Sequence, residues 1–151
     1  MDNKIKILEE IEKDFKEALA KREKEKISVL KLLKSAIHNY EIELRATHKK
    51  LTEDEIIKII KKEAKKREEA MKFYEGKRDD LFEKEKKELE ILKKYLPEEI
   101  SDDELIKIIR RKIDLLGLTN FGKIMGEVMK EVGNKADGKR VAELVKKELE
   151  K

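Results

Sequence analysis

Apolar residues recur at three- and four-residue steps along most of the chain, and charged residues fill the positions between them. This period predicts amphipathic α-helices, and no alternating run is long enough to indicate a β-strand. The pattern predicts four longer helices, at about 3–21, 25–45, 52–75 and 79–96. Three shorter helices are predicted at about 101–116, 120–132 and 137–149. The sequence therefore predicts an all-α protein.

Several predicted helix ends carry side chains with defined capping chemistry. Thr52-Glu53-Asp54-Glu55 and Ser101-Asp102-Asp103-Glu104 have the form of capping boxes. In the first box we expect the Thr52 hydroxyl to accept from the backbone N–H of Glu55, and the Glu55 carboxylate to reach back to the N–H of Thr52. Asp137 is expected to cap the last helix. Gly76 follows the third helix, where a left-handed conformation costs glycine little.

Pro97, the only proline of the chain, marks the predicted domain boundary. Proline cannot extend a helix, and it biases the residue before it away from the helical region. We expect an N-terminal bundle of four longer helices over residues 1–96 and a compact three-helix subdomain over residues 97–151. Within this subdomain Phe121, Met125 and Met129 are expected on inner faces, where methionine usually acts as core filler.

The composition narrows the classes of function. Of the 151 residues 49% are charged and 5% are aromatic, which favours narrow amphipathic helices over a thick core. The absence of cysteine excludes disulfides, thiolate chemistry and cysteine-bearing metal sites. The N-terminal sequence MDNKIKILEE does not have the form of a signal peptide, and no run has the length of a membrane span. We therefore expect a cytoplasmic protein without membrane contact.

The sequence shows no constellation that predicts catalysis. His38 and His48 lack the spacing of metal ligands, and no Ser/His/Asp set is credible. The segment 117–123 matches the first seven positions of a phosphate-binding loop, but Ile124 replaces the required Ser or Thr, and a helix precedes it instead of a strand. We expect no catalytic residue, no metal and no cofactor, and no activity of the chain alone. Most carboxylates are expected to pair with Lys or Arg four residues away on solvated faces.

Two windows of the chain are locally basic. The first spans residues 58–72 and the second spans residues 123–147, and each has an excess of three or four positive charges. A phosphate backbone would be attracted to such surfaces. The alternative is an ordinary solvated lysine face in a charge-rich protein, and the absence of interleaved aromatic residues gives no sign of base stacking.

Four ordered pieces of the chain resemble the GatB/YqeY family, specifically its stand-alone YqeY-like proteins. The pieces are KISVLKLLKSAI (26–37), EAKKREEA (63–70) with YEGKRDDL (74–81), ELEILKKYLP (88–97), and MGEVM (125–129) with ADGKRV (136–141) and LVK (144–146). The resemblance covers essentially the whole chain without large gaps. It implies two all-helical subdomains, in agreement with the boundary placed at Pro97.

The resemblance also implies a functional context. A similar module ends the B subunit of the glutamine-dependent amidotransferase that converts Glu-tRNA(Gln) or Asp-tRNA(Asn), and another is appended to some glutaminyl-tRNA synthetases. There the module contacts tRNA while the chemistry lies in other domains, so the carbon–nitrogen ligase label belongs to the longer relatives. The implied partners are tRNA and an amidotransferase or aminoacyl-tRNA synthetase.

From these arguments we expect a non-catalytic helical module that binds tRNA or supports tRNA-linked amidation. Its leading contacts are expected in the C-terminal subdomain, at Lys135, Lys139 and Arg140, and a second surface is expected in the 58–72 window. The alternative is a protein–protein adaptor with an apolar groove around Phe121, Met125 and Met129 and no nucleic acid. The oligomeric state and the tRNA identity do not follow from the sequence. The candidate nucleic-acid-binding residues are Lys123, Lys130, Lys135, Lys139, Arg140, Lys62, Lys65 and Lys66.

Overall fold

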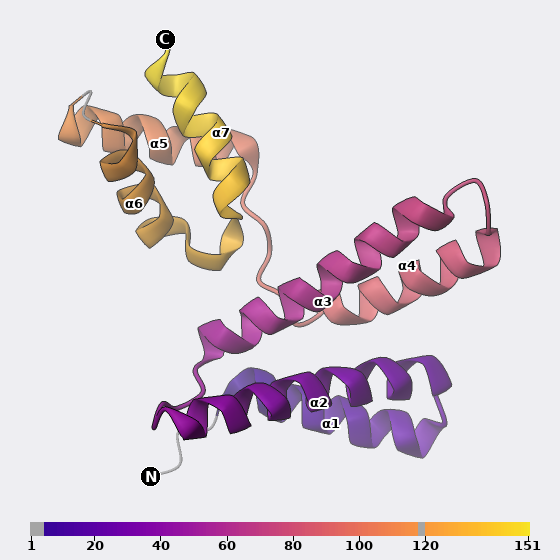
Figure 1. Cartoon of the computed structure of the whole chain (residues 1–151). Helices are drawn as coiled ribbons and strands as arrows, with labels where there is room; N and C mark the ends of the chain where they lie inside the picture. Colours follow the sequence, from indigo (N-terminus) through magenta and orange to yellow (C-terminus); the bar gives the residue numbers. More distant parts are fainter. Residues whose placement is uncertain (1–4, 118–119) are drawn as a thin grey trace. The chain divides into compact units, whose positions relative to one another are not determined.

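The protein is helical throughout the part of the chain that the computed structural model describes, residues 5–117 and 120–151 (Figure 1). The all-α prediction is confirmed for these residues. Contacts divide the chain into two compact units, Met1–Leu96 and Pro97–Lys151. Each unit has a hydrophobic core of its own.

The N-terminal unit consists of two helical hairpins. In the first hairpin α1 (Lys6–Lys21) packs against α2 (Lys24–Ala46), and in the second α3 (Glu53–Tyr74) packs against α4 (Asp79–Lys93) (Figure 1). The hairpins join because α2 contacts both α3 and α4. Their shared core is a layer of Ile, Leu and Val side chains closed by one tyrosine. Its buried members are Ile7, Ile11, Val29, Leu30, Leu33, Ile37, Ile56, Ile57, Ile60, Ala64, Leu89, Leu92 and Tyr95.

The helix ends follow the predicted chemistry with two differences. The Thr52 hydroxyl accepts from the backbone N–H of Glu55 at 3.3 Å, but the Glu55 carboxylate accepts from that hydroxyl at 3.1 Å instead of reaching the Thr52 backbone. Gly76 has φ of 75°, the left-handed conformation expected after α3. α4 ends at Lys93, three residues before the predicted end, and a turn connects it to Pro97. Proline disfavours the helical conformation of Leu96, and in a continuing helix its ring would clash with the carbonyl of Lys93, so the last helical turn before Pro97 is not formed.

A buried carboxylate links α1 to the end of α4. Asp14 is only 4% exposed, and its Oδ2 atom accepts hydrogen bonds from the Tyr95 hydroxyl at 2.5 Å and from the Lys94 ammonium at 2.7 Å. Its two partners lie 80 and 81 residues further along the chain. The expectation that carboxylates pair locally on solvated faces is therefore wrong for Asp14.

The hydrogen bonds decide the ionisation of this carboxylate. Burial raises the pKa of Asp14, but the hydrogen bonds from Lys94 and Tyr95 and the charge of Lys94 outweigh burial, so the pKa lies below its usual value. Burial, together with the bond to Asp14, raises the pKa of Tyr95. Tyr95 therefore stays protonated and donates to an ionised carboxylate, which is the stronger kind of hydrogen bond.

The C-terminal unit packs three short helices around a small core. They are α5 (Asp102–Leu116), α6 (Phe121–Val132) and α7 (Gly138–Leu149), with a 3₁₀ turn, η1 (Gly133–Lys135), between the last two. The Ser101, Asn120 and Asp137 side chains cap the three α-helices in order, each accepting from a backbone N–H three residues on. The buried residues are Leu105, Ile109, Ile124, Val128, Val132, Ala136, Val141 and Val145.

The prediction of an inward Phe121 was wrong. Its side chain is 42% exposed, while Met125 and Met129 are partly buried against the core, as methionine filler should be. Phe121 is the first residue of α6, and the fully buried Ile124 and Val128 fill the interior on its inner face. A three-helix unit of this size has little room for a phenyl ring at its rim.

We predict that Tyr95→Phe destabilises the N-terminal unit by about 1.5–3 kcal/mol, because a hydrogen bond to a buried charged group is lost. Urea unfolding followed by circular dichroism measures the effect. Tyr74→Phe is the matched control, because Tyr74 is half-buried on α3 and its hydroxyl makes no hydrogen bond to a carboxylate of the described residues.

The pH dependence supplies a second readout of the same variant. The pKa of Asp14 is lower in the folded protein than in the unfolded chain. The ionised Asp14 therefore stabilises the folded state fully at a pH above the unfolded pKa, and this stabilisation is lost as the pH falls through the folded pKa. In Tyr95→Phe this acid-dependent part should shrink. Equal acid dependence in Tyr95→Phe and the wild type would contradict the assigned role of Asp14.

Candidate nucleic-acid interface

One side of α3 presents a row of lysines to solvent. Lys58, Lys62, Lys65, Lys66 and Lys72 recur at steps of three, four or seven residues, so they share a face, and all five are exposed. We call these five residues the α3 lysine face. From Lys58 to Lys72 the face extends about 21 Å along the helix axis.

Most ammonium groups of this face have no carboxylate partner. Lys66 pairs with Glu63 at 3.3 Å, but no described carboxylate lies within ion-pair distance of Lys58, Lys62, Lys65 or Lys72. Glu69 is the acidic residue that falls among them on the helix. The candidates Lys62, Lys65 and Lys66 are therefore brought together on one face with a net positive charge.

The one arginine in this stretch of α3 has a different role. Arg67 is directed to α4, where its Nη1 atom lies 3.2 Å from Glu85 and 2.9 Å from Glu88. Burial raises the pKa of Glu88, and the charge of Arg67 counteracts part of that rise. Arg67 thus stabilises the hairpin of α3 and α4, which holds the α3 lysine face in position.

The lysine candidates of the C-terminal unit are exposed but scattered. Lys123 and Lys130 share a face of α6, with Glu127 between them, and Lys130 pairs with Glu127 at 3.4 Å. Lys135 lies in η1 and Lys139 in the first turn of α7.

The net charge of the protein is unevenly divided between the units. Residues 1–96 contain 27 Lys or Arg against 23 Asp or Glu, whereas residues 97–151 contain 12 of each. The whole formal charge of +4 therefore belongs to the N-terminal unit. Since phosphate attraction depends on local positive excess, the geometry favours the α3 lysine face over the C-terminal lysines.

Arg140 is occupied by contacts within its own unit. Its Nε atom donates to Asp102 at 2.8 Å and its Nη2 atom donates to the carbonyl of Ile100, so the guanidinium joins the start of α7 to the segment before α5. The side chain is 26% exposed. Sequence reasoning grouped Arg140 with its exposed neighbours because both partners lie 38 or more residues away. The structure gives it a structural role.

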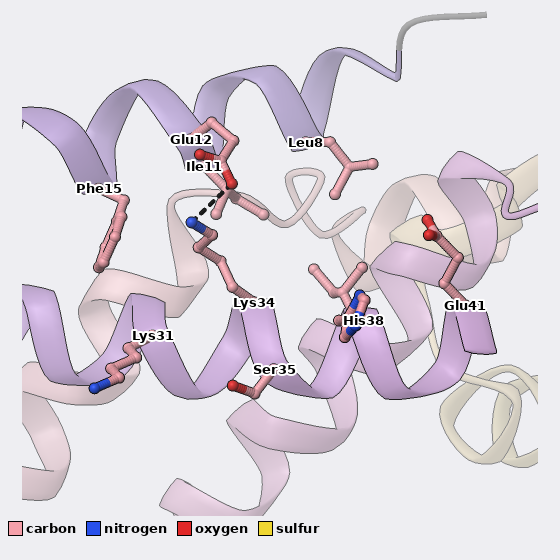
Figure 2. A pocket seen from close by; sticks show the side chains of 10 residues that line it. Leu8, Ile11, Glu12, Phe15, Lys31, Lys34, Ser35, His38 and Glu41 are labelled. Carbon is pink, nitrogen blue, oxygen red and sulfur yellow. Dashed lines mark ion pairs between the residues drawn. The ribbon is translucent and has the colours of Figure 1, made fainter. Parts of the chain in front are cut away.

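A shallow groove of about 470 Å³ runs between α1 and α2. Figure 2 shows an apolar floor that includes Leu8, Ile11 and Phe15, with Lys34 reaching across to Glu12. The ion pair between Lys34 and Glu12 measures 2.8 Å, and the Lys34 ammonium lies 4.2 Å from the centre of the Phe15 ring.

The remaining chemical candidates do not assemble into a site in the described residues. His38 lines the groove of Figure 2, His48 lies in the link after α2 with φ of 57°, and no metal-binding group of three His, Asp or Glu occurs in residues 5–117 and 120–151. Residues 118 and 119 of the loop-like segment lie outside the described residues. Asn120 caps α6 and Gly122 is inside that helix, so neither residue belongs to a strand-to-helix phosphate loop.

These features define the class of protein: a two-unit, all-helical module with a lysine-rich exterior. The family model of Yqey-like proteins matches residues 8–149, so the chain belongs to the YqeY-like family. The resemblance inferred from the sequence is confirmed at the level of the family.

The similar curated proteins come from fungi. The chain is 33% identical over 132 residues to "Altered inheritance of mitochondria protein 41, mitochondrial" of Clavispora lusitaniae, covering 85% of this chain and 75% of the relative. The protein of the same name in Pyrenophora tritici-repentis is 26% identical over 136 residues, covering 86% and 73%. The one in Candida glabrata is 36% identical over 90 residues, covering 58% of this chain and about half, 48%, of the relative.

The prediction of a cytoplasmic protein was wrong by this comparison, because the relatives carry mitochondrial names. The prediction relied on the lack of a secretory signal and of a membrane span, and these features do not distinguish one aqueous compartment from another. Within the described residues, none of the helices has the length and hydrophobicity that crossing a bilayer requires.

We predict that Arg140→Ala destabilises the C-terminal unit, whereas Lys139→Ala on the neighbouring exposed position changes its stability little. Loss of the guanidinium removes two hydrogen bonds, one of them to a carboxylate, at a cost of about 1–3 kcal/mol. Hydrogen exchange of the amides of α5 and α7 measures this local stability. If the amides of α5 and α7 exchange equally fast in the two variants, Arg140 does not have this structural role.

Proposed function

We propose that the protein is a non-catalytic helical module that binds tRNA through its phosphate backbone and thereby supports tRNA-linked amidation. The observation that carries this proposal is the α3 lysine face. It combines five exposed lysines on one side of one helix, in the unit that holds the whole net charge of the protein.

The physical support comes from the way polyanions bind. Lysines that neutralise phosphates release condensed counterions, which makes binding favourable and strongly salt-dependent. A face of about 21 Å is long enough to meet several phosphates along one strand. The tRNA itself, and the amidotransferase or synthetase that would use it, come from the resemblance to longer family members.

The proposal changes the expected order of the two surfaces. Lys135, Lys139 and Arg140 were expected to lead, with Lys123 and Lys130 beside them, but these lysines belong to a unit with balanced charge. We therefore assign them a secondary contribution. Arg140 is left out of the proposed interface because its guanidinium is engaged by Asp102 and Ile100.

The adaptor hypothesis keeps one specific observation in its favour. Leu115 and Phe121 are 73% and 42% exposed at neighbouring helix ends of the C-terminal unit. Exposed apolar residues of this kind occur at protein-binding surfaces. The adaptor hypothesis would be favoured if the protein recovers a protein partner from nuclease-treated lysate and enriches no tRNA. The double variant Leu115→Ser with Phe121→Ser should then lose that partner.

We predict that the triple change Lys62→Gln, Lys65→Gln and Lys66→Gln weakens tRNA binding about tenfold or more at 100 mM salt and lowers the salt slope by about two to three. Fluorescence anisotropy with a labelled tRNA transcript at several salt concentrations measures both. The matched control is Lys84→Gln, Lys86→Gln and Lys87→Gln, three exposed lysines of α4.

The same titration separates the two surfaces. Lys123→Gln, Lys130→Gln, Lys135→Gln and Lys139→Gln together should weaken binding less than the three changes on α3. If the α3 triple variant keeps both the affinity and the salt slope of the wild type, the α3 lysine face is not the interface. If the wild-type protein shows no salt-dependent tRNA binding, the proposed function itself is wrong.

A further inference from the structure

The fold of the N-terminal unit leaves one phenylalanine largely in solvent. Phe73 lies in the last turn of α3 and is 65% exposed. It belongs neither to the core of its unit nor to the residues packed against that core. Its ring meets the Tyr74 ring edge to face, with the two ring centres 5.3 Å apart. Single exposed apolar residues are common on protein surfaces, so the surroundings of this ring decide whether it has a role.

Phe73 continues the α3 lysine face. It follows Lys66 by seven residues and Lys62 by eleven, which are nearly whole numbers of helical turns, so the three side chains leave α3 on the same side. Phe73 lies about 10 Å beyond Lys66 along the helix axis. The basic window seen in the sequence ended at residue 72, one residue before this ring, which is why no aromatic residue was found among its lysines.

The surroundings of the ring carry a positive excess. Residues 58–80, from the start of the α3 lysine face to the first residues of α4, contain nine Lys or Arg against six Asp or Glu. Lys77, in the turn after α3, places its ammonium 5.1 Å from the centre of the Phe73 ring. Arg78 and Asp80 bind each other at 3.1 Å, whereas no described carboxylate lies within ion-pair distance of Lys77.

An exposed ring at the end of a row of cations matches the way proteins hold single-stranded nucleic acid. In such complexes a basic surface follows the phosphates, and bases stack on aromatic side chains. Because Phe73 is 65% exposed with one cation beside its ring, the ring has room for a base on the face away from Lys77. A membrane contact would instead require a broad apolar face, and no other large apolar residue of α3, which the structure describes in full, is exposed.

We infer that Phe73 stacks on an unpaired base of an RNA whose phosphates lie on the α3 lysine face. Unpaired bases occur in the loops and at the ends of RNA molecules, and proteins commonly recognise them by stacking on aromatic rings. Lys72 and Lys77 flank the ring in the sequence and supply charge for the phosphates beside that base. Since every base has a flat π-surface, the contact accepts any base. This inference rests on the proposed RNA binding of the protein.

The test separates contacts to bases from contacts to phosphates. One probe is a labelled oligouridylate of about ten nucleotides, and the other is a ribose–phosphate chain of the same length without bases. Phe73→Leu removes the aromatic ring and keeps an apolar side chain that suits a helix, whereas Phe73→Trp keeps an aromatic ring. Fluorescence anisotropy at several salt concentrations measures the affinities, and circular dichroism confirms that both variants keep the wild-type fold.

We expect Phe73→Leu to bind the oligouridylate about fivefold or more weakly than the wild type, because a base loses its stacking partner. The same variant should bind the chain without bases as tightly as the wild type does. Phe73→Trp should keep the wild-type affinity for the oligouridylate or exceed it. The salt slope should be equal in all three proteins, because neither substitution removes a charge, whereas the triple lysine variant of α3 lowers it.

Tryptophan fluorescence gives a second readout. The sequence contains no tryptophan, so the one introduced by Phe73→Trp reports on this position alone. Its emission should be quenched by the oligouridylate and not by the chain without bases, because only a stacked base contacts the indole. The matched control is Leu32→Trp, at a 55% exposed position of α2, whose emission should not change with either probe.

The possible results distinguish this inference from the proposed function. If Phe73→Leu binds the oligouridylate as tightly as the wild type, while the triple lysine variant of α3 is impaired, this inference alone is overturned. It is also overturned if the wild type binds both probes equally well, or if Phe73→Leu weakens the binding of both probes equally. If the wild type shows no salt-dependent RNA binding, the proposed function and this inference are both wrong. If vesicles containing phosphatidylserine bind the wild type but not Phe73→Leu, and the two proteins bind RNA equally, the ring belongs to a membrane contact and the inference is wrong.

Discussion

The hydrogen bonds from Lys94 and Tyr95 to Asp14 hold the end of α4 against α1 in the N-terminal unit. Asp14 brings a negative charge beside a core of mostly aliphatic side chains, and the charge is tolerable because Tyr95 and Lys94 both bind it. Removal of either donor leaves the carboxylate buried with one bond fewer. The three residues fix where the end of α4 meets α1, and the chain reaches Pro97 two residues later. Aliphatic core residues tolerate exchange for others of similar volume, whereas this hydrogen-bonded contact depends on these particular side chains.

The same layer determines which helix sides remain for binding. With the inner faces of α2 and α3 committed to the shared core, their opposite faces are exposed on rigid helices. The α3 lysine face arises in this way. It needs no pocket, because a phosphate backbone is bound by charge and donors spread along a surface and not by enclosure.

The sequence predicted those features of the structure that depend on residues close together in the chain. Helix positions and the caps at Thr52 and Ser101 follow from spacing and side-chain type, and the structure contains them. The sequence did not reveal the role of Asp14, because its partners are 80 and 81 residues away and only tertiary packing brings them together. Phe121 was misplaced because periodicity identifies a helix face but not the capacity of a three-helix core. The composition revealed the basic windows. It did not reveal which of their charged side chains have partners within the protein.

Arginine and lysine side chains have different roles in this charge-rich protein. Arg67 and Arg140 each bridge two partners in other segments, a task suited to a planar guanidinium with several fixed donors. The lysines of the α3 lysine face mostly lack such partners and remain hydrated point charges. Hydrated point charges neutralise phosphates whatever the base sequence, and phosphate contacts carry no sequence information directly. An interface that consisted of these lysines on phosphates would therefore select RNA by the course of its backbone, and any preference for one tRNA would have to come from its shape or from a partner protein.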